Sequence, residues 1–168
     1  MNSSATFERC IFQNNWSGSK GGSLAVIDSS RSFLFETVID GSYSESAGGA
    51  IYLDDTASTE LVDSHIIRCT AESRGGAIYA AGHSSLSIKQ SSIHSNRAIS
   101  GGGGGILLQD SVTANLTDSL VWVRFFFSTV IHLKLSRITL QLTEQESIPP
   151  AKRDWILPIA LCSLMWPL

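Results

Sequence analysis

Proline, cysteine and charge are all scarce in this chain of 168 residues. The four prolines lie at or after Pro149, so no fixed φ angle interrupts the chain before that point. The three cysteines are too few for a disulfide framework, and Cys162 stands alone near the end of the chain. Charged residues make up only 16% of the chain, and residues 1–119 carry 12 acidic against 7 basic side chains. This acidic balance, with no basic stripe, argues against nucleic acid as a partner.

Motifs for catalysis and metal binding are also missing. The sequence contains no CxxC, HExxH or GxSxG motif, and residues 101–105, all glycine, are not followed by Lys-Ser or Lys-Thr as in a phosphate-binding loop. The four histidines are scattered, and none pairs with a suitably spaced Cys or His to suggest zinc. We therefore expect no cofactor and no dedicated catalytic residue.

No segment predicts a membrane span or a signal peptide. Residues 120–140 contain Arg124, His132, Lys134 and Arg137, which are too costly in a bilayer core. Residues 155–168 are apolar but number only 14 and include two prolines. The chain enters its first repeat at once after Met1, without the regions of a signal peptide, which predicts a fragment or a protein not exported by that route.

Glycine pairs repeat along the first two thirds of the chain. The pairs beginning at Gly21, Gly48 and Gly75 are 27 residues apart, and Gly101-Gly102 follows 26 residues later. A period of 20 to 50 residues is typical of a solenoid, a propeller or a repeat array. Positive φ angles or a close backbone approach are the expected reasons for the glycines.

Apolar residues recur at the same period. Each of three columns gains one residue of spacing after residues 101–105, so a single insertion there keeps all three in register. The columns read Phe7, Leu34, Leu61, Ile88, Leu116; Phe12, Ile39, Ile66, Ile93, Val121; and Leu24, Ile51, Ile78, Ile106.

Within each repeat the apolar residues alternate with polar ones over short stretches, near residues 5–8, 10–13 and 24–27 of the first repeat. Alternation of period two predicts strands with one buried face. Three strands per repeat, stacked on the repeat before, predict a right-handed parallel β-helix of about four to five coils. We expect it to span residues 1–121, followed by a non-repeat tail at 122–168.

Small polar residues form two further inward columns. One consists of Cys10, Thr37, Ser64, Ser91 and Ser119, and the other of Asn15, Ser42, Cys69 and Asn96. An asparagine at such a corner can adopt left-handed backbone angles, and its amide can bond the neighbouring coil. Cys10 and Cys69 lie about two coils apart, roughly 10 Å, which is beyond the reach of a disulfide.

The repeats resemble the paired FxxN and GGAI motifs of the chlamydial polymorphic outer-membrane proteins. The resemblance covers roughly residues 3–121, and Ser42 and Cys69 replace the asparagine in repeats two and three. It implies a β-helical, adhesin-like or autotransporter-passenger-like segment that is extracellular or displayed at a cell surface. The motif residues are Phe12, Asn15, Gly21, Gly22, Gly48, Gly49, Ile51, Gly75, Gly76, Ile78, Asn96, Gly103, Gly104 and Ile106.

Acidic residues at the predicted turns are the best chemical candidates. Asp28, Asp55 and Asp110 align after the third strand, with Asp54 adjacent, and Glu36, Asp63 and Asp118 align at another corner. Carboxylates in adjacent coils could lie about 5 Å apart, close enough to share Ca²⁺ or to perturb each other's pKa. The competing interpretation is that they are solvated turn residues with no metal.

The tail has a different composition and three interpretations. It could cap the last coil, insert in a membrane, or be an extension not selected to fold with the repeats, and we expect poor order from about Glu144 onward with at most one further strand pair before it.

For the whole chain we expect a non-enzymatic scaffold that binds an unknown surface ligand, protein or glycan, and that adjoins neighbouring coils of a longer array. A carbohydrate-active β-helix enzyme of the pectinase or polysaccharide-lyase kind is the alternative.

Overall fold

The computed structural model describes residues 3–122, 132–136 and 139–141, and every regular element among them is a β-strand. Each of the first four coils contains four strands, of five, three, two and three residues. In the first coil these are β1 (Ser4–Glu8), β2 (Ile11–Gln13), β3 (Trp16–Ser17) and β4 (Leu24–Val26). The second coil has β5 (Arg31–Phe35), β6 (Val38–Asp40), β7 (Tyr43–Ser44) and β8 (Ile51–Leu53).

The third coil has β9 (Ser58–Val62), β10 (His65–Ile67), β11 (Thr70–Ala71) and β12 (Ile78–Ala80). The fourth has β13 (Ser85–Lys89), β14 (Ser92–His94), β15 (Arg97–Ala98) and β16 (Ile106–Leu108). A fifth coil begins with β17 (Thr113–Thr117) and β18 (Leu120–Trp122), and β19 (His132–Ser136) and β20 (Thr139–Gln141) follow.

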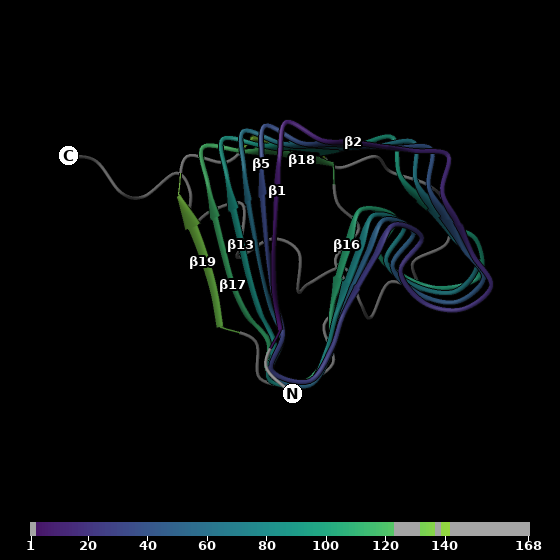
Figure 1. Ribbon diagram of the computed structural model, residues 1–168, viewed down its shortest axis with the longest axis horizontal. Coiled ribbons are helices and arrows are strands. Elements are labelled where there is room, and N and C mark those ends of the chain that lie inside the picture. Colours follow the sequence, from purple (N-terminus) through teal and green to yellow (C-terminus); the bar gives the residue numbers. More distant parts are fainter. Residues whose placement is uncertain (1–2, 123–131, 137–138, 142–168) are drawn as a thin grey trace, which may run out of the picture.

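Equivalent strands of successive coils pair in parallel and form four sheets (Figure 1). The sheet orders are β1-β5-β9-β13-β17-β19, β2-β6-β10-β14-β18-β20, β3-β7-β11-β15 and β4-β8-β12-β16. The register sets Phe7 opposite Leu34 and Leu34 opposite Leu61, so that the partners are one 27-residue repeat apart. This architecture, an all-β parallel solenoid with a 27-residue coil, confirms the fold class expected from the sequence.

The prediction of three strands per repeat is wrong by one strand. The additional strand is the two-residue element represented by β3, β7, β11 and β15, which turns the chain between the second sheet and the glycine pair. Two residues are too short to show alternation, so the pattern that located the other strands carries no signal there.

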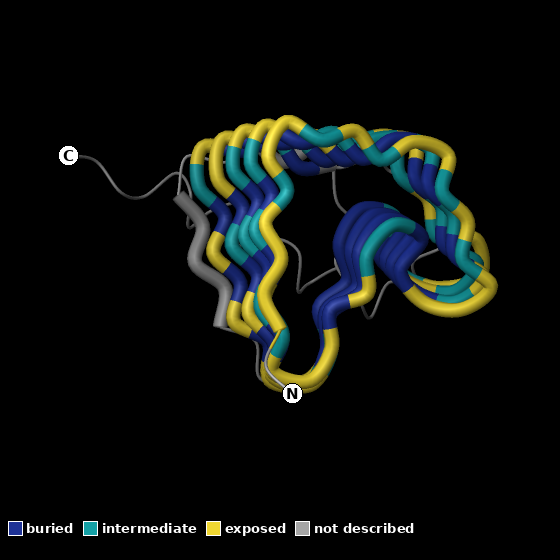
Figure 2. Tube along the Cα trace, in the orientation of Figure 1, coloured by how far each residue is buried: buried dark blue, intermediate teal, exposed yellow. Residues whose placement is uncertain are grey.

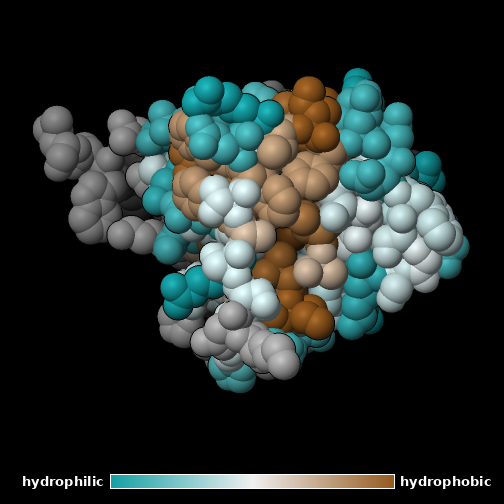
Figure 3. Space-filling view, in the orientation of Figure 1, coloured by the Kyte–Doolittle hydropathy of each residue, from teal (hydrophilic) through white to brown (hydrophobic). Residues whose placement is uncertain are grey.

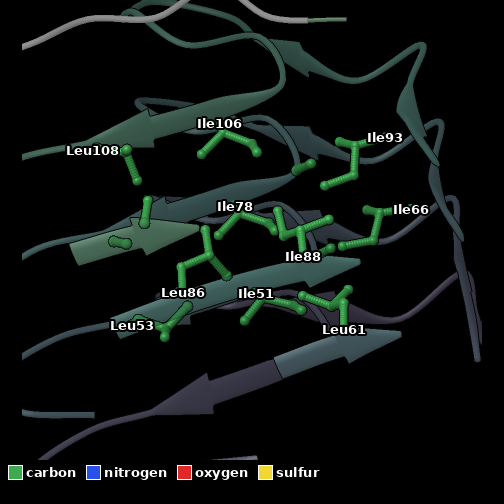
Figure 4. Packing of buried hydrophobic residues seen from close by; sticks show 14 of the residues in the cluster. Ile51, Leu53, Leu61, Ile66, Ile78, Leu86, Ile88, Ile93, Ile106 and Leu108 are labelled. Carbon is green, nitrogen blue, oxygen red and sulfur yellow. The ribbon is translucent and has the colours of Figure 1, made fainter. Parts of the chain in front are cut away.

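The apolar columns form one continuous core inside the solenoid. Ile51, Ile78 and Ile106 stack on one another, as do Leu61 and Ile88, and Ile66 and Ile93 (Figure 4). In the first coil Phe7, Phe12 and Leu24 are only partly buried, contrary to the expectation that they would be buried like the rest of their columns. Described residues stack on one side of that coil only, which leaves its apolar interior open in the end-on view (Figure 3).

The two glycines of each pair have different structural reasons. The first has positive φ, with values of 66° at Gly21, 69° at Gly48 and 61° at Gly75. The second faces the next coil, and a Cβ added to Gly49 would lie 2.1 Å from the carbonyl oxygen of Gly76. No side chain can be placed at that distance from a backbone oxygen, so the second glycine fixes the close approach of successive coils.

The insertion in the glycine run lies before the fourth pair. Gly103 has φ of 76° and Gly76 donates its N–H to the Gly103 oxygen, so Gly103 and Gly104 occupy the positions of the earlier pairs. Gly101-Gly102, the pair nearest to the 27-residue spacing, is therefore not the structural equivalent. Only a pair directly before β16 has the geometry that the turn into the third apolar column requires.

The inward hydroxyl column forms a continuous hydrogen-bonded ladder. The N–H of Thr37 donates to the Ser64 Oγ at 3.1 Å, and the N–H of Ser64 donates to the Ser91 Oγ at 3.1 Å. Each hydroxyl in turn donates to a carbonyl two residues earlier, as Ser64 does to Val62 at 2.8 Å. A hydroxyl at this corner satisfies a backbone N–H that the sheets leave without a partner.

The asparagine column behaves as expected in its hydrogen bonds but not in its backbone angles. Asn96 Oδ1 accepts from the N–H of Cys69 at 2.8 Å, and its Nδ2 donates to the Ile66 carbonyl at 2.9 Å. The left-handed residue is instead the one before, with φ of 52° at Asn14 and 54° at Arg68. The side chain that points inward must follow the residue that reverses the backbone, which the repeat alone does not distinguish.

The apolar columns continue beyond the point at which the sequence pattern was expected to end. Leu135 in β19 lies in register with Leu116, and Leu140 in β20 lies in register with Val121. The spacing falls to 19 residues there, which hides the columns from a search at a 27-residue period. The predicted poor order from Glu144, the aromatic cap near Phe125 and Phe127, and Cys162 lie outside the described residues.

Candidate functional site

The acidic turn column takes part in the construction of the coils. Asp28, Asp55 and Asp110 all have left-handed backbone angles, with φ of 58°, 60° and 64°. The N–H of Asp28 donates to the Asp55 Oδ2 at 3.4 Å, and the N–H of Gly82 donates to the Asp110 Oδ2 at 3.4 Å. Aspartate tolerates this conformation better than most residues because its short side chain can bond locally, so the turn itself explains the column.

Asp54 faces a different partner from its neighbour. Its Oδ2 accepts a hydrogen bond from the Tyr52 hydroxyl, and its Oδ1 accepts from the N–H of Asp55 at 2.9 Å. Within residues 3–122 and the two later strands, no three His, Cys, Asp or Glu residues come together in a way that could hold a metal ion.

The second acidic column also marks a turn. Glu36, Asp63 and Asp118 have φ of 46°, 48° and 50°, and Arg9, at the same position of the first coil, has 52°. Arg9 Nε lies 3.2 Å from a Glu36 carboxylate oxygen, with both side chains largely exposed. Exposed ion pairs of this kind contribute little to stability, about 0–1 kcal/mol.

The two described cysteines are free thiols inside their columns. Cys69 is fully buried, and its Sγ donates to the Ile67 carbonyl at 3.3 Å. Burial raises the pKa of the Cys69 thiol to about 11, so the thiol is neutral near pH 7 and is a poor nucleophile. It belongs to the core and not to a reactive site.

A hollow on the outer surface brings together side chains from three other columns. Residues 17–23 fold back beside the outer face of the β4-β8-β12-β16 sheet, which is why all three residues of β8, β12 and β16 are buried, in contrast to the alternation along β13 (Figure 2). The hollow measures about 190 Å³ and is lined by Lys20, Ser46, Ala47, Tyr52, Ser73, Arg74 and Tyr79.

Two stacked tyrosines form the floor of this hollow. The rings of Tyr52 and Tyr79 are 5.3 Å apart at their centroids and 2° from parallel, and both residues are buried in a small second core with Ala47, Ala81 and Leu107. Lys20 Nζ lies 4.4 Å from the centroid of the Tyr52 ring and donates to its hydroxyl at 2.6 Å. Burial, followed by the hydrogen bond to Asp54, raises the pKa of Tyr52, so this hydroxyl stays protonated.

The second tyrosine connects to the second cation through an amide. The Tyr79 hydroxyl donates to Gln109 Oε1 at 3.0 Å, and Arg74 Nη1 donates to the same oxygen at 3.1 Å. The arrangement places two positively charged groups, Lys20 and Arg74, at one hollow, where each is held by neutral oxygen atoms.

Sequence reasoning missed this hollow, although a signal was present. Lys20, Ala47 and Arg74 share one repeat position, Ser46 and Ser73 share the position before, and Tyr52 and Tyr79 share a third. The 27-residue alignment therefore groups these residues in columns. It does not show that the three columns meet, because that depends on how residues 17–23 fold back.

The comparisons with known proteins agree with this architecture. A family model described as a right-handed β-helix region matches residues 1–130. Nothing matched among curated proteins or among solved structures. Within the described part of the chain, no helix has the length and apolar character needed to cross a membrane. The four-sheet solenoid and the family match together establish that the chain belongs to the right-handed β-helix family.

Proposed function

We propose that this β-helix is a non-enzymatic binding scaffold, secreted or displayed at a cell surface. The observation that carries the proposal is the use of the candidate acids. Asp28, Asp55 and Asp110 occupy left-handed turn positions and bond backbone N–H groups of their own or adjacent coils. A carboxylate that is required by the turn geometry is a structural group, so its presence needs no catalytic explanation.

The outer surface supplies the second line of support. The hollow at Lys20 and Arg74 interrupts an otherwise repetitive surface and presents several hydrogen-bond donors. Loops and surface positions held by a rigid scaffold are where binding residues concentrate. The resemblance of the GGAI and FxxN motifs to chlamydial polymorphic outer-membrane proteins supports display outside the cell.

A carbohydrate-active enzyme is the second candidate. The observation in its favour is that Asp28, Asp54 and Asp55 come from adjacent coils and gather at one turn, where the Asp28 N–H contacts the Asp55 carboxylate. Paired carboxylates at a surface could act as an acid and a base, or hold Ca²⁺ between coils.

An activity screen separates the two candidates. The full chain is incubated with acidic and neutral polysaccharides, with and without added Ca²⁺, and the release of reducing ends or unsaturated products is followed. We expect no turnover above a buffer control for the wild type or for Asp55→Asn. Turnover by the wild type that Asp55→Asn abolishes, while its melting temperature is unchanged, would establish the enzyme instead.

A binding measurement addresses the scaffold directly. Immobilised glycans and surface proteins are presented to the full chain, and the bound fraction is compared with that of a chain unfolded by heat. We expect the folded chain alone to bind a subset of these ligands reversibly and unchanged.

A further inference from the structure

The hollow has the shape of a gap between two long cationic side chains. Lys20, Ala47 and Arg74 occupy the same position in three successive coils, and Ala47 and Arg74 form a parallel β-bridge. Successive coils are about 4.8 Å apart, so the backbones of Lys20 and Arg74 are separated by roughly 10 Å. The small side chain of Ala47 leaves the space between them empty.

Lys20 is held at the hollow without a carboxylate partner of its own. Its ammonium group donates to the Tyr52 hydroxyl at 2.6 Å and lies over the Tyr52 ring. The nearest acidic group in this network, Asp54, accepts from the same tyrosine hydroxyl on its other side. Tyr52 thus stands between the two charges and fixes the ammonium group in one place.

Arg74 is also held by a neutral group. Its one recorded hydrogen bond goes to the amide oxygen of Gln109, which leaves further guanidinium N–H groups for a ligand. Among the described residues the ion pairs join Arg9 to Glu8 and Glu36, Arg68 to Asp40, and Lys89 to Glu60, and neither cation of the hollow takes part in them. In a repeat region with 12 acidic and 7 basic side chains, two such cations at one hollow are unusual.

The tyrosines restrict the kind of ligand. Their rings cover each other, and the outer face of Tyr52 is occupied by Lys20, so Tyr52 is only 3% exposed and Tyr79 only 7%. A sugar ring that binds by stacking needs an open aromatic face, and Tyr52 offers none. Recognition at this hollow must therefore come from charge and hydrogen bonds, supplied by Lys20, Arg74 and the hydroxyls of Ser46 and Ser73.

We propose that the hollow binds a single oxyanion group, a sulfate, phosphate or carboxylate, between Lys20 and Arg74. The inference rests on the proposed scaffold function and names the chemistry of its ligand. The volume of about 190 Å³ suits one such group with part of the molecule that carries it, and is small for a whole drug-sized ligand. The group is either a free inorganic anion or an ester or carboxylate on a glycan.

The test uses probes that differ only in the anionic group. Sodium sulfate, a monosulfated disaccharide and the same disaccharide without sulfate are titrated into the isotopically labelled full chain, and amide shifts near the hollow are followed by NMR. The variant Lys20→Gln/Arg74→Gln removes both cations of the hollow. Arg31→Gln/Arg97→Gln removes two exposed cations elsewhere on the repeats and is the matched control.

We expect sulfate and the sulfated disaccharide to bind in the millimolar range, and the unsulfated sugar to cause no shift. The hollow variant should weaken binding about tenfold, because each partly exposed charge contact contributes a few-fold in affinity. The control variant should stay within about twofold of wild type, and binding should weaken as NaCl is raised. Tighter binding of the sulfated sugar than of sulfate identifies a glycan-borne group, and equal binding identifies the free anion.

Three results would overturn the inference: no shift with any anion, equal binding by the hollow variant, or equal weakening by the control variant. Matching melting temperatures for the two variants show that both are folded, and Lys20→Arg/Arg74→Lys should retain binding. If no anion binds while the polysaccharide screen is also silent, the anion site is lost and the scaffold proposal stands. Turnover in that screen would instead remove the scaffold proposal.

Discussion

The inward and outward columns of the same strands follow different rules. Along the second sheet the inward column reads Phe12, Ile39, Ile66, Ile93 and Val121, and all five side chains are apolar. The outward column reads Ile11, Val38, His65 and Ser92, and it changes from apolar to polar within four coils. An inward side chain must pack on its own equivalent in the next coil, whereas an outward one meets solvent. The interior therefore records the fold, and the exterior is free to record binding.

The glycine that sets the approach of two coils should show the largest effect. Gly49→Ala would place a Cβ 2.1 Å from the Gly76 oxygen, and the backbone cannot yield there without separating the coils. We expect a loss of more than about 4 kcal/mol in the free energy of unfolding, measured by urea denaturation. The control is Gly18→Ala, whose Cβ would meet the exposed Trp16 ring at 3.1 Å. A fold that tolerates both substitutions equally would show that the glycine pair is not a packing requirement.

The next largest effect compares an inward with an outward isoleucine. Ile66 is fully buried, and Ile66→Ala should cost about 2–5 kcal/mol through lost burial and the cavity that remains. Ile11, in the equivalent sheet, is 73% exposed, and Ile11→Ala should change stability by less than about 0.5 kcal/mol. Chemical denaturation of the two variants measures both values. Similar losses for the two would contradict the assignment of inward and outward faces.

The buried thiol predicts a decline in stability at high pH. Cys69 has a pKa of about 11 in the folded protein against 9.0 for the free thiol, so between these values the unfolded chain binds fewer protons. Stability must then fall as the pH rises from about 9 to about 11, by up to roughly 2–3 kcal/mol. The measurement is urea denaturation of wild type and Cys69→Ser across this range. The wild type should lose more stability than the variant, and parallel curves would rule out the thiol as the cause.

The smallest effect is expected at the acidic turn. Asp55→Asn keeps a side chain that tolerates φ near 60°, and it should change stability by less than about 0.5 kcal/mol. Asp55→Ala should cost about 1 kcal/mol because alanine is less suited to the left-handed conformation. Thermal melts of the two variants at neutral pH give the comparison. A large loss on Asp55→Asn would mean that the negative charge itself is needed, as a bound cation would require.

The candidate site could be predicted from the sequence only in part. The 27-residue period placed Asp28, Asp55 and Asp110 at a turn, and the structure places them there with left-handed angles. The period could not show that Lys20, Arg74 and the tyrosines meet, since they come from separate columns. The sequence also missed β3 and its equivalents because a two-residue strand has no periodic pattern.

The sequence by itself determined the coil length, the inward columns and the right-handed parallel β-helix. Parallel stacking brings each residue next to its equivalent one repeat away, so a regular spacing in the chain becomes contact in space. Only the tertiary structure decided what gathers outside the coils. Residues 17–23 fold back on the β4-β8-β12-β16 sheet and create the hollow, and β19 and β20 join their sheets after a shortened spacing. Both depend on the path of connecting segments, which no repeating pattern specifies.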